Sequence, residues 1–283
     1  MDRTRARPST YELVLLAIVA VVFVWSGISP HDRFTWVLEV FPVILGVPAL
    51  IYVYPRFRFT PLVYTLIAVH AIILMVGGKY TYAEVPFGFW MRDALGFARN
   101  HYDRIGHFAQ GFVPAMVARE ILIRRSPLRG TTWLPFVVIC ICLALSAFYE
   151  LIEFWTALAT GGAAEAFLGT QGDPWDTQWD MMLALIGAIT ALVLLGRVHD
   201  RQLRRVVASC RPTWPRACRA LRCNAHAQSG LLSQLASCPV PHSDAYCALP
   251  WLRHFSPRRS RGVAMPRQAQ LSRPRRTRWC RTG

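Results

Sequence analysis

The sequence predicts an all-α membrane protein, with a six-helix transmembrane bundle over residues 1–198 and an Arg/Pro-rich, disordered tail over 199–283. Three observations lead to this prediction. The chain is 53% hydrophobic with a mean hydropathy of +0.28, which is more apolar than a typical soluble domain. Its apolar residues gather into six stretches close to the length of a membrane span. Arginines concentrate in alternate connections between these stretches, as expected for a multi-pass membrane protein.

The six predicted spans are joined by polar connections. A span needs about 20 apolar residues. The stretches that meet or approach this length are Glu12–Ser26, Phe34–Tyr54, Pro61–Gly77, Ile105–Ile123, Thr132–Ala159 and Trp179–Gly196. The first is expected to remain as an anchor, because no convincing small-residue cleavage site follows it. The fourth is the least apolar, since it contains His107, Gln110, Arg119 and Glu120.

Basic residues predict which side of the membrane each connection faces. With the N-terminus in the cytoplasm, the inside segments carry the arginines of 3–7, 56–58, 119–129 and 197–205. The outside segments carry fewer basic residues, namely Arg33, Lys79, Arg92, Arg99 and Arg104. The positive-inside rule therefore places both termini in the cytoplasm. The same rule supports the fourth span, whose removal would send Arg124 and Arg125 outside.

The tail accounts for the whole net charge of +16, because residues 197–283 contain arginine but no lysine and only two acidic residues, Asp200 and Asp244. It shows no sustained helical or strand period, which is typical of disorder. A basic tail can bind anionic lipid or nucleic acid. We favour a non-functional read-through or frame-shifted end, and expect membrane lipid and no nucleic acid as partner.

The predicted outer loop, residues 78–101, is rich in aromatic residues. Phe87, Phe89, Trp90 and Phe97 lie close together around Arg92 and Asp93. This pattern fits a helix lying on the outer leaflet, and equally an ordinary aromatic belt at the membrane surface.

Polar residues of three predicted spans fall at one depth near the outer side. Asp103 and His107 are four residues apart, so they share a helix face, and Gln110 continues the same stripe. The other members are carboxylates of the fifth and sixth spans, Glu150, Glu153, Asp173, Asp176 and Asp180. Ionisable groups inside membrane spans are costly and usually functional. The sequence therefore predicts a polar pocket that opens outward.

Each of these residues also has a structural explanation. Asp173 before Pro174 resembles a helix N-cap, with Asp176 in the first turn, and capping is the better interpretation of those two. Asp103 has Arg104 beside it as an ionic partner, and a lone His107 is more often a hydrogen-bonded interior residue. Glu150, Glu153 and Asp180 are harder to explain in this way, because carboxylates in apolar sequence need a cation, a proton or buried donors.

Three solutions remain open for this cluster. Asp103, His107, Glu150, Glu153 and Asp180 have the donor types of a divalent metal site, since oxygen ligands with one imidazole suit Zn, Mn, Mg or Ca. Some of these carboxylates can instead act as general acids or relay protons. The cluster can also be a structural network between spans. We expect Arg104, Gln110 and Asp176 to contact substrate.

Three motifs resemble one bacterial family. The segments "HYDRIGHFAQGFVPAMVARE", "SAFYELIEFW" and "GTQGDPWDTQWDMMLALIGA" together are similar to the YjdF-like inner-membrane proteins, a family without an assigned function, over roughly residues 10–198. A more distant similarity is to VanZ-like proteins. Asp103, His107 and Phe108, then Glu150 and Glu153, then Asp180 and Gly187 follow their motifs, whereas Ala184 stands where those proteins tend to have Asn. This resemblance implies a role in the cell envelope or with lipids, but no reaction.

The leading hypothesis is a pocket that binds a lipid headgroup or the phosphate of an envelope precursor. A divalent metal would assist binding and, if the protein is an enzyme, hydrolysis at the membrane. The alternatives are a proton-coupled carrier and a structural membrane scaffold. A carrier is favoured less, because the sequence shows no clear repeat and the cluster lies away from the midplane. The substrate, the metal and the oligomeric state are left open.

Overall fold

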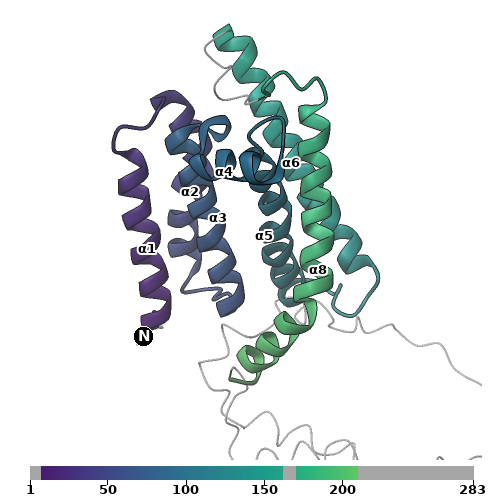
Figure 1. Ribbon diagram of the computed structural model, residues 1–283. Coiled ribbons are helices and arrows are strands. Elements are labelled where there is room, and N and C mark those ends of the chain that lie inside the picture. Colours follow the sequence, from purple (N-terminus) through teal and green to yellow (C-terminus); the bar gives the residue numbers. More distant parts are fainter. Residues whose placement is uncertain (1–7, 162–169, 210–283) are drawn as a thin grey trace, which may run out of the picture. The chain divides into compact units, whose positions relative to one another are not determined.

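The computed structural model describes residues 8–161 and 170–209, and this part of the chain is helical without strands (Figure 1). Six long helices and one short helix account for most of it, together with a single 3₁₀ turn, η1. They are α1 (Thr10–Gly27), α2 (Arg33–Val53), α3 (Pro61–Tyr80), η1 (Tyr82–Glu84), α4 (Pro86–Leu95), α5 (Tyr102–Arg125), α6 (Trp133–Thr160) and α8 (Asp176–Ser209). The six long helices coincide with the six predicted apolar stretches.

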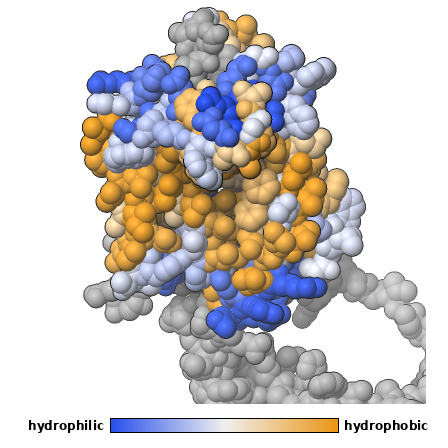
Figure 2. Space-filling model, viewed as in Figure 1, coloured by the Kyte–Doolittle hydropathy of each residue, from blue (hydrophilic) through white to orange (hydrophobic). Residues whose placement is uncertain are grey.

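Five of the described helices are long and apolar enough to cross a membrane, namely α1, α2, α3, α6 and α8. The sixth long helix, α5, contains 24 residues and would extend about 36 Å at 1.5 Å per residue. Its polar residues keep it below the hydropathy of the other five. The composition thus supports five of the six predicted spans. Figure 2 shows the apolar belt formed on one face, with hydrophilic residues at both ends.

The helices pack in two groups that meet where α3 contacts α5. In the first group α3 packs against α1 and α2, and in the second α5 packs against α6 and α8 (Figure 1). Two apolar clusters are buried, one within the first group and one that joins the start of α3 to the second group. Val40, Ala68 and Met75 are buried in the first group. Met116 and Val138 are buried in the second group.

Two glycines allow α5 and α8 to approach each other closely. A Cβ atom on Gly111 of α5 would collide with the backbone oxygen of Ala184 on α8. A Cβ atom on Gly187 of α8 would likewise collide with the backbone oxygen of Phe108. Because backbone atoms cannot rotate away as side chains can, both positions require glycine. The crossing therefore fixes the register in which α5 faces α8.

Local signals explain where several helices begin. The α1 helix starts with a capping box formed by Ser9 and Glu12. The Asp32 side chain accepts a hydrogen bond from the Thr35 backbone N–H at 2.6 Å and caps α2. Hydrogen bonding to Thr35 lowers the pKa of Asp32 below its ordinary value. The α3 helix begins with Pro61 in its first turn.

The α8 helix differs from the sequence-based expectation at both ends. It begins at Asp176, and Asp173 instead accepts a hydrogen bond from the Trp175 backbone N–H at 3.0 Å in the preceding turn. The predicted helix start at Pro174 is therefore two residues too early. At its other end the helix continues past residue 198 to Ser209. Residues 210–283, the rest of the predicted disordered tail, lie outside the described residues, so that prediction remains untested.

The aromatic outer loop forms η1 and α4. The α4 helix ends at Gly96, which adopts a left-handed conformation with φ of 70°. Phe87 and Trp90 stack on each other with ring centroids 5.6 Å apart, and both remain exposed. A short helix with exposed aromatic side chains agrees with the interfacial-helix interpretation.

Candidate functional site

The imidazole of His107 lies between carboxylates from three helices. Its Nε2 atom is 3.3 Å from Asp103 Oδ1 on the same helix and 3.8 Å from Asp180 Oδ2 on α8. Its Nδ1 atom is 3.8 Å from Glu150 Oε1 on α6. The side chains of His107, Glu150 and Asp180 are 7%, 6% and 4% exposed. The predicted cluster of α5, α6 and α8 residues is therefore present and buried.

The cluster consists of two groups of potential metal ligands that share His107. Ligand atoms of Asp103, His107 and Asp180 lie within 4.8 Å of one another, and so do those of His107, Glu150 and Glu153. The two ring nitrogens point to different groups, with Nε2 toward Asp103 and Asp180 and Nδ1 toward Glu150. The five residues, some of which the sequence predicted to hold a metal, therefore offer two alternative three-ligand sites that share His107.

Three buried atoms of this cluster have no hydrogen-bond partner within the described part of the chain. They are His107 Nδ1, Glu150 Oε1 and Asp180 Oδ1. Buried polar atoms are normally satisfied, because leaving one unpaired costs about 1–3 kcal/mol. Two of the three, His107 Nδ1 and Glu150 Oε1, belong to the pair that is 3.8 Å apart. Two of the three unpaired atoms thus lie on the Glu150 side of the ring, whereas Asp180 lies on the Nε2 side.

The second helix contributes a carboxylate that the sequence reasoning missed. Glu39 on α2 is 5% exposed, and its Oε2 atom accepts a hydrogen bond from the Tyr149 hydroxyl at 3.1 Å. The Tyr149 ring packs edge-on against the His107 ring, with centroids 6.5 Å apart. A lone glutamate within the apolar span Phe34–Tyr54 was the available signal. Glu39 and Tyr149 therefore connect α2 to the cluster.

Arg99 and Arg104 connect the segment before α8 to the start of α5. Arg99 donates to Asp176 at 2.8 Å and to Asp173 at 3.1 Å, and also contacts the Thr170 carbonyl. Arg104 donates to Asp173 at 3.2 Å. Burial and the charges of Arg104 and Arg99 lower the pKa of nearby His101. Asp173 and Asp176 thus serve mainly as ionic partners of these arginines. Like Glu39, Arg99 was not singled out from the sequence.

The three predicted substrate contacts have different surroundings. Arg104 lies over the Trp179 ring, with its guanidinium carbon 5.5 Å from the ring centroid, and its side chain is 30% exposed. Asp176 is occupied by Arg99 and its side chain is 8% exposed. Gln110 is half-buried on α5, three residues beyond His107. Substrate binding by these residues remains a prediction, for which Arg104 has the most accessible position.

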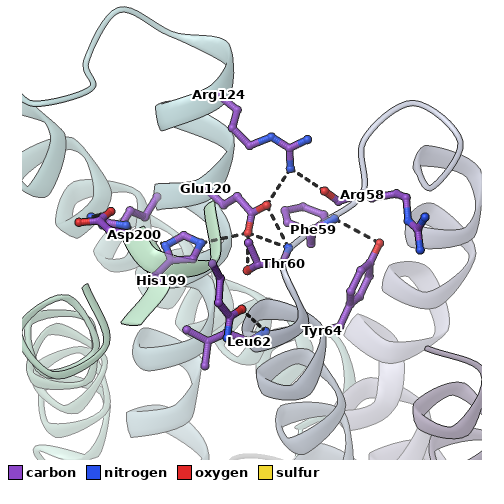
Figure 3. Close-up of polar contacts among 11 residues, drawn as sticks. Arg58, Phe59, Thr60, Leu62, Tyr64, Glu120, Arg124, His199 and Asp200 are labelled. Atoms are coloured by element: carbon purple, nitrogen blue, oxygen red, sulfur yellow. Dashed lines mark hydrogen bonds and ion pairs between the residues drawn. The ribbon is translucent and has the colours of Figure 1, made fainter. Parts of the chain in front are cut away.

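A second buried polar cluster lies at the opposite end of α5. Glu120 Oε2 is 3.0 Å from His199 Nε2 on α8, and both side chains are fully buried (Figure 3). Glu120 also accepts hydrogen bonds from the Thr60 hydroxyl at 2.8 Å and from Arg124 at 2.7 Å. The sequence reasoning missed His199 because it assigned that residue to the tail. The cluster ties α8 and the start of α3 to α5.

An ion pair extends this second cluster. Arg119 donates to Asp200 at 2.7 Å, and its other terminal nitrogen is 2.8 Å from His199 Nδ1. Both ring nitrogens of His199 thus have polar partners, unlike Nδ1 of His107. The Glu120–His199 cluster therefore has the features of a structural network.

Comparison with known proteins identifies relatives of this chain. Residues 11–201 match a family described as "Predicted membrane protein (DUF2238)". The chain is 57% identical over 187 residues to "Inner membrane protein YjdF" of Escherichia coli (strain K12), an alignment that covers 66% of this chain and 90% of the relative. No solved structure matches. The predicted YjdF-like family is confirmed, whereas the more distant VanZ-like similarity remains a prediction.

Proposed function

This chain belongs to the DUF2238 family of predicted membrane proteins, and we propose that it is an inner-membrane protein that binds a phosphate-containing headgroup through a divalent metal ion. The ligand class is a membrane lipid or a lipid-linked envelope precursor. The relative named as an inner membrane protein supports the location. The arginine-rich ends of α5 and α8 support a cytoplasmic position for that end. The His107 cluster would then open to the periplasm, and α5 would be the sixth span.

The observation that carries the metal proposal is the pair of unpaired atoms, His107 Nδ1 and Glu150 Oε1. One imidazole nitrogen and carboxylate oxygens are ligands that Zn²⁺ and Mn²⁺ accept. In this arrangement His107 Nδ1, Glu150 and Glu153 would hold the ion. Asp103, 3.3 Å from Nε2, orients the ring as carboxylates do for many metal-bound histidines.

A cation would also balance the charge of the cluster. Glu39, Asp103, Glu150, Glu153 and Asp180 bring five carboxyl groups around one imidazole. The described arginines closest to them, Arg99 and Arg104, pair with Asp173 and Asp176 instead. Burying uncompensated carboxylates is expensive. A divalent ion would provide the missing positive charge and a binding point for a phosphate that the carboxylates alone would repel.

Hydrolysis is the reaction that best fits this arrangement. A bound divalent ion polarises a phosphoryl oxygen and activates water. Asp180 Oδ1 is buried and unpaired, but Asp180 lies on the Nε2 side of the imidazole, opposite Glu150, so it would help Asp103 to orient the ring. Glu39, through Tyr149, would hold the α2 side of the site in place.

The residues between the two polar clusters favour a site that is reached from one side of the membrane over a proton-coupled carrier. Val113 and Met116 on α5 and Ala188 and Ala191 on α8 are buried and apolar. They lie along the helices between the His107 cluster and the Glu120 cluster. A proton path through this layer would need polar groups or water, which apolar side chains do not stabilise.

Metal analysis of the purified full chain tests the proposal. We expect about one Zn²⁺ or Mn²⁺ per chain in the wild type after loading and dialysis, and a loss of at least tenfold in metal affinity in the Glu150→Gln/Glu153→Gln variant. Glu84→Gln is the matched control, because Glu84 is 57% exposed and outside the cluster. Glycerol 3-phosphate should then bind only to the metal-loaded protein.

Two results would contradict this function. Equal metal content in the wild type and the double variant would show that Glu150 and Glu153 are not metal ligands. The scaffold alternative would be supported by two observations together: the wild type binds no metal, and the double variant unfolds at a lower temperature than the wild type.

A further inference from the structure

The first helix group contains an apolar groove, and none of its lining residues belongs to the His107 cluster. It has a volume of about 350 Å³ and is lined by all three helices α1, α2 and α3. Its walls include Leu16 and Val19 of α1, Val47 and Leu50 of α2, and Ala68 and Ala71 of α3. Each of these helices is apolar enough to cross the membrane. The groove therefore lies within the hydrocarbon layer.

One end of the groove is polar. Glu12 and Tyr54 are among its lining residues, and the Tyr54 hydroxyl donates to Glu12 Oε2 at 2.7 Å. Arg58 donates to the same oxygen at 2.8 Å, and its side chain remains 40% exposed whereas that of Glu12 is 14% exposed. Arg56, two residues earlier, is exposed. Basic groups thus lie where the groove meets the membrane surface.

The size and chemistry of the groove identify its occupant. Apolar cavities exclude water and accept apolar ligands. A helix about 10 Å in diameter needs far more room than about 350 Å³. An extended alkyl chain fits such a narrow, apolar space.

The headgroup must supply the selectivity of such a site. Moving an alkyl chain from lipid to an apolar groove gains little, because both surroundings are equally apolar. Arginines at the membrane surface attract anionic headgroups, and Arg58 already has one face covered by the Tyr54 ring at 4.9 Å. A lipid phosphate at Arg58 and Arg56 would complete the polar end of the groove.

We infer that the groove between α1, α2 and α3 is a binding site for one acyl chain of an anionic glycerophospholipid, with the lipid phosphate at Arg58 and Arg56. This site is separate from the α5–α6–α8 site and is independent of the proposed metal chemistry. It gives the peripheral helix α1, which packs chiefly against α3, an additional contact through lipid.

Native mass spectrometry of the full chain with phosphatidylglycerol and phosphatidylcholine of matched chains tests this site. We expect the wild type to retain one phosphatidylglycerol at least fivefold more than phosphatidylcholine. Ala68→Trp fills the groove and should reduce retention at least tenfold. Val69→Trp is the matched control, because the neighbouring Val69 is 47% exposed and does not line the groove. It should retain lipid as the wild type does.

Two further variants keep the test decisive. Val47→Trp fills the opposite wall and carries the same expectation if Ala68→Trp does not fold, as judged by circular dichroism and gel filtration. Glu12→Gln/Arg58→Gln removes both charges together, and should abolish the preference for phosphatidylglycerol without abolishing lipid retention.

Equal retention by the wild type and the groove-filling variants would overturn the acyl site. Equal retention of the two lipids by the wild type would overturn the assignment of the headgroup.

Discussion

His107 Nδ1 and Glu150 Oε1 lie 3.8 Å apart, both buried and both without a hydrogen-bond partner among the described residues. On the other side of the same ring, His107 Nε2 is 3.3 Å from Asp103 Oδ1. The imidazole therefore has one side with a close carboxylate and one side with a gap. In the proposed metal site, this asymmetry would give the carboxylates different roles, with Glu150 as a ligand and Asp103 as the residue that orients the ring.

Asp103→Asn should weaken metal binding without abolishing it. Replacing the carboxylate that orients a metal-bound histidine typically costs 10–100-fold in metal affinity. We expect a loss in this range for Zn²⁺, measured by competition with a chelating dye. Asp93→Asn is the control, because Asp93 is 68% exposed on α4. If Asp103→Asn abolished binding as completely as Glu150→Gln, Asp103 would be a direct ligand.

Gly187→Ala should destabilise the protein, whereas Gly196→Ala on the same helix should not. A Cβ atom at Gly187 meets the backbone of α5, but nothing lies within 4 Å of one at Gly196. Overpacking typically costs about 1–3 kcal/mol, and alanine favours a helix over glycine by about 1 kcal/mol. Thermal unfolding in detergent should therefore show a lower midpoint for the first variant only. Equal midpoints would mean that the two helices can separate freely.

Glu120→Gln should lower stability and leave metal binding unchanged. Removing one member of a buried ionic network typically costs about 3–5 kcal/mol, and the Glu120 side chain is fully buried against His199, Thr60 and Arg124. Asp200→Asn should have a smaller effect, because the Asp200 side chain is 46% exposed and exposed pairs contribute about 0–1 kcal/mol. A change in metal affinity for Glu120→Gln would show that the two clusters are coupled.

Asp32 should make stability depend on pH in the acid range. Its pKa is lowered in the folded protein by hydrogen bonding to Thr35, so the folded state binds fewer protons than the unfolded state. Its contribution is therefore fully present above the ordinary aspartate pKa and is lost as pH falls through the lowered value. Asp32→Asn keeps a capping side chain and should flatten this part of the profile of unfolding midpoint against pH. An unchanged profile would exclude Asp32 as its source.

Five of the spans could be predicted because each one is a continuous apolar run. The sequence also indicated that His107, Glu150 and Asp180 share a depth, since helical rise converts position in a span into depth. It could not show that the ring of His107 divides the carboxylates into two groups, because this depends on side-chain rotation and helix packing. Glu39 is more than 60 residues before His107 in the chain, and only the packing of α2 brings it near Tyr149.

The role of His199 could not be predicted from the sequence for a different reason. The arginine excess begins at residue 197, so composition alone placed the end of the membrane domain there. Burial of His199 against Glu120 is a tertiary contact between helices far apart in the chain, and no local pattern reports it. The α8 helix continues beyond residue 198 to Ser209, through residues that are too polar to read as a span.

The glycine crossing of α5 and α8 limits how a ligand can enter the site. Gly111 and Gly187 bring the backbones of these two helices into contact. We therefore expect α5 and α8 to move together as one rigid pair. Glu150 and Glu153 stand on α6, which has no such contact with α5 or α8 at a described glycine. Admission of a headgroup should thus depend on displacement of α6, or of the short turn held by Arg99, while Asp103, His107 and Asp180 keep their positions.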